Sequence, residues 1–224
     1  MPRDEYQDTL EELREDVLYM SEIVLERLQM GLSALQDKDE DLAWKVIEGD
    51  HEVNELYLEL EQECIDLIAL QQPVAGDLRF IAASFKIITD LERIGDLATN
   101  LGDYTLDAEQ EMFPDVDIQT IGARTIEMVE DAMEAYAWED SDACYRIADR
   151  DDEIDAMCEK ASELVARDLI ERQDITSEAK IQQTMKDVYR ILLTIRDLER
   201  VGDHAVNIAA RTLYMVESND DLLY

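Results

Sequence analysis

The chain has 224 residues, of which 46% are hydrophobic and 34% are charged. This length accommodates one large or two small domains with a hydrophobic core, and the apolar content excludes a disordered acidic tail. Acidic residues number 56 against 20 basic ones, so the formal net charge is −36 and binding to nucleic acid or anionic lipid is disfavoured. An acidic surface with few lysines suits a cytosol of very high salt, and we hypothesise a halophilic source.

The N-terminus MPRDEYQDTL lacks an apolar signal region, and no apolar run approaches the ~20 residues of a membrane span. We therefore expect a cytoplasmic protein without membrane insertion. The three cysteines, Cys64, Cys144 and Cys158, are odd in number and form no CxxC pair. This pattern favours buried, reduced thiols, with a thiol site as the alternative.

In chain order, the apolar spacing first predicts three long helices. A polar break at Asp37–Asp41 separates the first helix from the second. The second ends in QQPVAGD, residues 71–77, where Pro73 and Gly76 interrupt a helix. The third helix is expected to run to about Glu109.

The segment Glu111–Asp117, with Pro114, is the best boundary between domains, which predicts domains at 1–110 and 115–224. Asp115 is a candidate N-cap for a fourth helix that runs to about Trp138. The N-cap candidates of the last two helices are Asp140 or Ser141, and Thr176 or Ser177, with the sixth helix running to about Glu217. No segment shows strand-like alternation, so the predicted fold is all-α, with two three-helix bundles in tandem.

One segment occurs twice in this pattern. DLERIGDLATN at 90–100 returns 107 residues later as DLERVGDHAVN at 197–207, with eight of eleven positions identical. Both copies lie in the third helix of their half. The duplication predicts that the two halves use equivalent positions for the same purpose.

Each copy places a carboxylate in an otherwise apolar stripe. Such a side chain costs several kcal/mol when it is unpaired, so it needs a partner. One turn later each Glu is followed by an Asp, and another turn later by an Asn, giving an oxygen-rich ladder on one helix face. The ladder positions are Glu92, Asp96 and Asn100 in the first copy and Glu199, Asp203 and Asn207 in the second.

The preceding helix of each half supplies matching polar residues. In an antiparallel hairpin, residues equidistant from the turn face each other. Reflection about Pro73 in the first half and position 177 in the second brings these residues together. The predicted clusters are Asp50, Asn54, Glu92 and Asp96 in the first half, and Asp151, Asp155, Glu199 and Asp203 in the second.

Several close carboxylates do not all remain ionised without cations, and all-oxygen ligands favour Mg, Ca, Mn or Fe over thiolate-bound Zn. The clusters therefore predict metal sites. Solvated or Arg-paired acids remain the alternative, although Arg93 and Arg200 point ~100° away from the adjacent Glu. Arg196 lies one turn before Glu199, but its counterpart in the first copy is Thr89.

Other metal-ligating or catalytic candidates are weaker. His51 and His204 adjoin the polar positions, but neither histidine recurs in the other half. The chain has no Gly-rich phosphate loop, no Cys–His or Ser–His constellation and no Glu-x-x-His pair. A ferritin-like di-iron oxidase is thus disfavoured.

At this level of detail LERIGDLATN and LERVGDHAVN resemble the paired signature of the PhoU family, the accessory and regulatory proteins of phosphate-specific transport. VIEGDHEVNEL, QQPVAGDLR and the six-helix layout are also similar to that family. The resemblance implies two three-helix bundles related by pseudo-two-fold symmetry. It also implies multinuclear iron or zinc clusters, which some members bind through E(D)-x-x-x-D motifs.

By this resemblance most cluster positions match family ligands, namely Glu92, Asp96, Glu199, Asp203, Asp151, Asp155 and Asp50. Asn54 departs from the pattern because it replaces an acid, which lowers the charge of the first cluster. The oxygen ligands and the resemblance together predict divalent or trivalent metal ions, with Fe, Mn, Mg, Ca and Zn as the candidates.

The resemblance implies a non-enzymatic adaptor. Such a protein restrains phosphate uptake through the ATPase subunit of the phosphate ABC transporter and, in bacteria, signals to a sensor kinase. Paired halves with apolar rims make a homodimer the expected assembly. Two alternatives stay open, a hydrolase with a carboxylate-held dinuclear metal centre and a metal-free structural helical adaptor.

Overall fold

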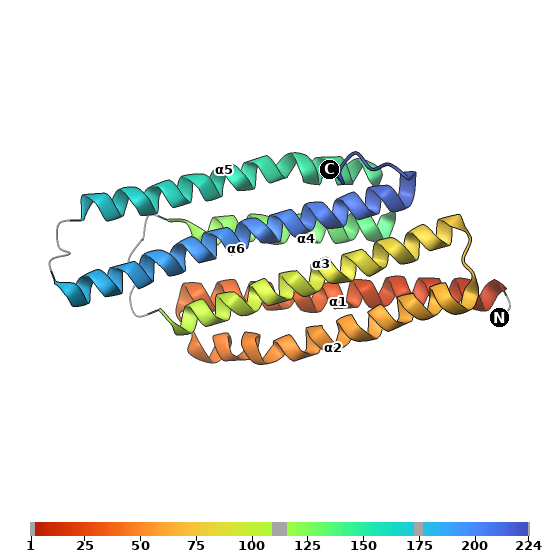
Figure 1. Ribbon diagram of the computed structural model, residues 1–224, viewed down its shortest axis with the longest axis horizontal. Helices are drawn as coiled ribbons and strands as arrows, with labels where there is room; N and C mark the ends of the chain where they lie inside the picture. The colour runs from red at the N-terminus through yellow and green to blue at the C-terminus, as the bar shows by residue number, and fades with distance from the viewer. Residues whose placement is uncertain (1–2, 109–115, 173–176, 224) are drawn as a thin grey trace.

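The computed structural model describes residues 3–108, 116–172 and 177–223. Within these ranges the chain is almost wholly helical and contains no strand, as the apolar periodicity predicts. The helices are α1 Arg3–Asp37, α2 Glu40–Gln71, α3 Ala75–Leu106, α4 Ile118–Trp138, α5 Ser141–Glu171 and α6 Glu178–Glu217 (Figure 1). The predicted six-helix order is confirmed.

Four helices begin at a side chain that accepts a hydrogen bond from the backbone N–H three residues later. These N-caps are Asp39, Asp117, Asp140 and Ser177. For α4 the cap is Asp117 instead of the predicted Asp115, because the Asp117 carboxylate reaches both the backbone nitrogen and the hydroxyl of Thr120, at 3.0 and 2.6 Å. Asp115 lies outside the described residues, as do Glu109, Pro114 and Thr176.

Four helices end next to a residue in the left-handed conformation, and none of these four residues is a glycine. The chain has only seven glycines. Within the described ranges the residues with positive φ are Lys38, Gln72, Glu139 and Ser218, at 50° to 58°. A left-handed conformation costs a side-chain-bearing residue about 1–2 kcal/mol. Lys38 and Glu139 occupy equivalent turns, between the first and second helices of their halves.

The helices form two bundles that share an interface. In the first half α3 packs against α1 and α2, and in the second half α6 packs against α4 and α5. The halves meet through α3 against α6 and α1 against α4, while the described parts of α2 and α5 contact only their own bundle. Figure 1 shows the α2–α3 turn and the facing ends of α5 and α6 at opposite ends of the molecule.

The predicted apolar stripe of α6 is packed only over part of its length. Ile181, Met185 and Leu192 are 43%, 59% and 38% exposed, although they continue the stripe of buried residues. The reason is length, since α4 has 21 residues and α6 has 40, so α4 does not cover the first turns of α6 (Figure 1).

One hydrophobic core runs through both halves. At the contact between halves, the rings of Phe80 and Tyr136 stack with centroids 6.2 Å apart, and the Arg14 guanidinium lies over both rings. The buried Tyr136 hydroxyl is 2.7 Å from the Ser84 hydroxyl, which satisfies its hydrogen-bonding need. None of the helices within the described ranges combines the length and apolar character of a membrane span.

Candidate metal centres

Each repeated motif lies on the helix of its half, α3 or α6, that packs against both other helices of that half. A methyl group at Gly95 would lie 3.0 Å from Cγ1 of Val53 on α2, and one at Gly202 would lie 3.3 Å from Oδ1 of Asp151 on α5. These are closer than ordinary van der Waals contacts. Glycine in the motif therefore lets the neighbouring helix approach the backbone directly beside the acids.

In the first cluster, Asp50, Asn54 and Glu92 are half-buried and Asp96 is exposed. The Asn54 amide donates to Oδ2 of Asp50 at 2.7 Å. The Thr99 hydroxyl lies 3.4 Å from Oδ1 of Asp50, but its single hydrogen has a closer acceptor in the Gly95 carbonyl, at 3.1 Å.

The remaining acids of the first cluster lie in each other's electrostatic field. Burial, followed by the charge of Asp96, raises the pKa of Glu92 above its ordinary value. Burial, followed by the charge of Asp50, raises the pKa of Asp96. These shifts mean that the charged forms repel one another, which a bound cation would relieve.

In the second cluster the repulsion is stronger. Burial, followed by the charges of Asp155 and Asp203, raises the pKa of Asp151 to about 6. Burial and Asp155 also raise the pKa values of Glu199 and Asp203. Oδ1 of Asp151 is buried and has no hydrogen-bond partner among the described residues. An ionised oxygen in that situation lacks compensation from the protein itself.

No three His, Cys, Asp or Glu side chains within the described ranges are grouped closely enough to enclose a metal ion. A cation would therefore need Glu199, Asp203 and Asp155 to turn toward Asp151. Asp155 and Asp203 are exposed and Glu199 is half-buried, so these side chains are able to change rotamer. The orphaned oxygen of Asp151 is the feature of the second cluster that fits a cation.

The alternative that arginines pair with the cluster acids has no support in the described part of the chain. None of the seven cluster carboxylates lies within salt-bridge distance of a Lys, Arg or His there. Arg196 and Arg200 instead lie 3.5 and 3.7 Å from Oδ1 of Asp197. The charge of Arg200 lowers the pKa values of Asp96 and Asp203 only against the larger effect of burial.

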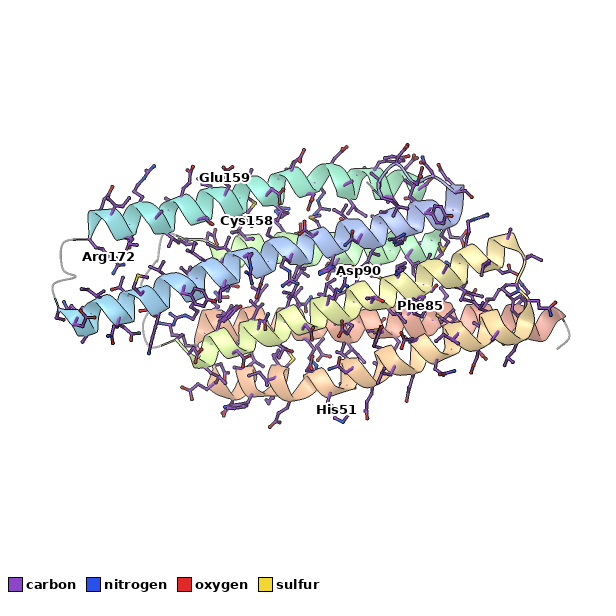
Figure 2. The ribbon with its side chains drawn as sticks, in the orientation of Figure 1. His51, Phe85, Asp90, Cys158, Glu159 and Arg172 are labelled. Carbon is purple, nitrogen blue, oxygen red and sulfur yellow. The ribbon has the colours of Figure 1, made fainter. Side chains whose placement is uncertain are left out.

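The first residue of each motif has a role that sequence reasoning missed. Asp90 is 7% exposed and points from α3 toward α6 (Figure 2). Asp197 is 1% exposed and reaches from α6 to α3. Asp197 accepts hydrogen bonds from the Asn100 amide at 3.0 Å and the Tyr104 hydroxyl at 2.7 Å. The repeated acids at these two positions therefore join the halves.

The reciprocal contact involves the other copy. Nδ1 of His204 lies 2.8 Å from Oδ1 of Asp90, and the Asn207 amide donates to the same oxygen at 3.4 Å. Each motif thus gives its Asn to the Asp of the other motif. Helical geometry could have indicated this role. An acid two residues before the Glu points ~200° around the helix from it and therefore toward another neighbour.

These contacts change the interpretation of Asn100 and Asn207. Both were further ladder positions next to the clusters, but the structure places their amides on the acids of the opposite half. Eight residues exceed two full helical turns, so the third ladder position points in a different direction from the first. On both α3 and α6 the third position therefore faces the interface between the halves.

The histidines and cysteines lie mainly outside the clusters. His51 is exposed, with Nε2 3.5 Å from Glu55, and His204 is bound to Asp90. All three cysteines are free and buried, and burial raises the pKa of Cys64 and Cys158 to about 12 and of Cys144 to about 11. The prediction of buried, reduced thiols is confirmed.

Comparison with known proteins identifies relatives over nearly the full chain. The model of the PhoU domain family matches residues 17–105 and, separately, residues 118–212. The phosphate-specific transport system accessory protein PhoU of Escherichia coli is 33% identical over 213 residues, covering 94% of this chain and 85% of the relative. A PhoU homologue of Thermotoga maritima is 35% identical over 206 residues, covering 91% and 85%.

Solved structures agree in fold. The crystal structure of PhoU from Pseudomonas aeruginosa superposes with a TM-score of 0.87 at 31% identity, covering 96% of this chain and all of that one. The phosphate transport system regulatory protein PhoU from Streptococcus pneumoniae superposes with a TM-score of 0.84 at 26% identity, covering 96% and 98%. Both halves of the chain are thus matched in sequence and in fold.

Proposed function

The chain belongs to the PhoU family, and from this we propose that it is an accessory protein that regulates phosphate uptake. The observation that carries the proposal is the match of the PhoU domain to both halves. Relatives that align with more than nine-tenths of this chain are named as accessory proteins of the phosphate-specific transport system. Their names describe an accessory protein and no catalytic activity.

In this proposal the protein acts as a cytoplasmic adaptor. Six helices with one continuous core provide a rigid body on which partners can dock. The proposed partners are the ATPase subunit of the phosphate ABC transporter and, in a bacterial source, a sensor kinase. A homodimer is the proposed assembly.

The proposal includes metal binding at the two clusters. Asp151, Asp155, Glu199 and Asp203 would hold a cation in the second half, and Asp50, Glu92 and Asp96 would supply the ligands of the first. Support comes from the buried, unpartnered Oδ1 of Asp151 and from the raised pKa values of the acids around it. When bound, the cation would offset their repulsion and offer an open position to a phosphate or a partner carboxylate.

Deletion of the gene in the organism that encodes this protein tests the regulatory role. The deletion strain is expected to continue rapid uptake of labelled phosphate after a shift to high external phosphate, and re-expression of the chain should restore the decrease. An unchanged response in the deletion strain would contradict the proposal. Direct docking is tested by titrating the purified chain against the purified ATPase subunit of the transporter.

A further inference from the structure

The basic residues of α3 gather on the side of the helix that meets the second half. All three, Arg79, Lys86 and Arg93, are spaced by seven residues. Asn100 is the next position in this series, and its amide donates to Asp197 of α6. Residues seven apart lie on nearly the same face of a helix, so this face of α3 borders α6.

An equivalent series lies on α6 at the offset of 107 residues that relates the two motifs. It contains Lys186, Leu193 and Arg200, and its next position is Asn207. The Asn207 amide donates to Asp90 of α3, so this face of α6 borders α3. The two series therefore lie on either side of the seam between α3 and α6.

Two further arginines of α6 lie along the same seam. The charge of Arg196 reaches Tyr104 of α3, as the charge of Arg200 reaches α3 at Asp96. Arg211 is the equivalent of Tyr104, whose hydroxyl crosses to α6. We define the basic seam as the following six residues: Lys86, Arg93, Lys186, Arg196, Arg200 and Arg211.

The basic seam is exposed and has few ion pairs. Five of its six residues are exposed and Arg211 is half-buried, since α3 and α6 cross in front of α1 and α4 (Figure 1). Within the described ranges four of the six form no ion pair, namely Lys86, Arg93, Lys186 and Arg211. Arg196 and Arg200 reach only Asp197, at 3.5 and 3.7 Å, and their side chains remain 60% and 46% exposed. A chain with 56 acidic and 20 basic residues thus presents a row of largely unpaired cations here.

A hollow with an apolar floor lies at one end of the basic seam. Its volume is about 430 Å³, and its main lining residues are Tyr104, Leu106, Lys186, Tyr189, Arg190 and Leu193. Asp187 at 2.8 Å and the Asp107 carbonyl at 2.9 Å hold the Arg190 guanidinium in place. Tyr189 is 67% exposed, so its ring is available to a partner.

We infer that the basic seam and this hollow bind an acidic segment of a partner protein, whose carboxylates pair with the cations while an apolar side chain fills the hollow. This inference refines the adaptor role in the proposed function, on which it rests. Surfaces of opposite charge steer association and select partners. Lys186 and Arg211 lie ~38 Å apart along α6, a length that about 12 extended residues cover.

A protein segment fits this surface better than a nucleic acid does. The net charge of −36 opposes any polyanion, and the acidic clusters flank the seam on the same two helices. A narrow segment lies between those clusters, whereas the wide phosphate backbone of a duplex would approach them. The apolar floor of the hollow buries an aliphatic or aromatic side chain and offers nothing to a phosphate.

The two parts of this surface respond differently to salt. Salt screens exposed ion pairs, whereas the burial of apolar side chains persists. In the high-salt cytosol that the composition suggests, the hollow would supply affinity and the cations selectivity. A partner segment therefore needs both carboxylates and an apolar residue.

The test adds a fluorescein-labelled peptide to the full chain in chelator and follows the fluorescence anisotropy. The peptide has about 12 residues and alternates Glu with Leu and Trp. A second peptide carries Gln in place of Glu. The wild type is compared with a seam variant that combines Lys86→Gln, Arg93→Gln and Lys186→Gln, all at exposed side chains.

A matched control variant combines Lys45→Gln, Lys160→Gln and Arg167→Gln. It removes the same three charges from exposed side chains of α2 and α5. Tyr189→Ala tests the hollow, and Tyr19→Ala on α1 is its control, because these tyrosines are 67% and 52% exposed. Circular dichroism melts establish that every variant folds.

The wild type is expected to bind the Glu peptide and not the Gln peptide. The seam variant should bind at least about tenfold more weakly, equivalent to 1.4 kcal/mol, while its control stays within about twofold of the wild type. Tyr189→Ala should weaken binding by about fivefold and Tyr19→Ala should not. Raising the salt to about 1 M should weaken the wild type more than it weakens the seam variant.

A wild-type chain that does not bind the Glu peptide would overturn the inference, and so would a control variant that loses as much affinity as the seam variant. Tighter binding of a single-stranded oligothymidylate of equal charge would show that the surface selects nucleic acid instead. The phosphate-uptake experiment decides the regulatory role independently of these results.

Discussion

The first and second halves of the molecule use the same motif in different surroundings. In the first half, Asp50 receives a 2.7 Å hydrogen bond from Asn54, whereas Oδ1 of its equivalent Asp151 is buried without a donor among the described residues. The buried acids also differ, since Asp197 binds Asn100 and Tyr104 while Asp90 binds His204 and Asn207. A duplicated motif therefore sets where the acids lie, and their neighbours decide what each acid does.

The largest expected effect is at the interface between halves. Asp197→Ala should lower the free energy of unfolding by about 3 kcal/mol, because it leaves the Asn100 amide and the Tyr104 hydroxyl without their acceptor. Asp90→Ala should cost less, about 2 kcal/mol, because only its contact to His204 is short. Urea denaturation measures both, and negligible losses would contradict the assigned role of these acids.

Asp151→Asn tests the unsatisfied side of the comparison. The pKa of Asp151 is raised from 3.8 to about 6, so its ionisation opposes folding. This destabilisation is absent below about pH 4, grows between about pH 4 and 6, and is constant above about pH 6. The full shift corresponds to roughly 3 kcal/mol, which solvent screening of this half-exposed acid reduces to about 1 kcal/mol.

In chelator at pH 7, Asp151→Asn should therefore be about 1 kcal/mol more stable than the wild type, and the two should converge near pH 4. Asp50→Asn is the matched variant in the first half. It should give no comparable gain, because Asp50 already accepts a 2.7 Å hydrogen bond from the Asn54 amide. Urea denaturation at several pH values provides the comparison, and a gain from Asp50→Asn as large as that from Asp151→Asn would contradict it.

The motif glycines should respond in opposite ways. Alanine in place of glycine favours a helix by about 1 kcal/mol. In Gly95→Ala the new methyl group would lie 3.0 Å from Val53, and this close contact offsets the gain in helix stability. The free energy of unfolding should therefore change little or decrease. Gly202→Ala should raise the melting temperature slightly but weaken Mn²⁺ binding, since its methyl group would press on Oδ1 of Asp151 at 3.3 Å. Unimpaired Mn²⁺ binding by Gly202→Ala would contradict the placement of Asp151 in the site.

The smallest effects are expected at the equivalent turns. Lys38→Gly should stabilise the protein by about 0.5–1 kcal/mol, because glycine tolerates the φ of 54° better than lysine. Glu139→Gly should gain less, since Glu139 also lies 2.6 Å from Arg14 of the other half. Thermal melts at matched salt distinguish the two, and a larger gain from Glu139→Gly would show that this ion pair contributes nothing.

Much of the fold was predictable because it depends on short-range chemistry. The six helices follow from apolar spacing, and the caps at Asp140 and Ser177 follow from side chains that reach a backbone N–H three residues away. The cap of α4 was misplaced because several acids precede that helix, and only the backbone path selects Asp117. Proposed metal ligands were found by repetition, and their role stays a prediction.

The repeated carboxylates were identified by sequence alone, since helical periodicity and the near-identity of residues 90–100 and 197–207 are local properties of the chain. Only the tertiary structure separated the buried acids from the solvent-facing ones. The contact of Asp197 with Asn100 joins residues 97 positions apart, so it depends on the register and crossing of α3 against α6. No local pattern encodes that geometry, because it results from packing both bundles around one core.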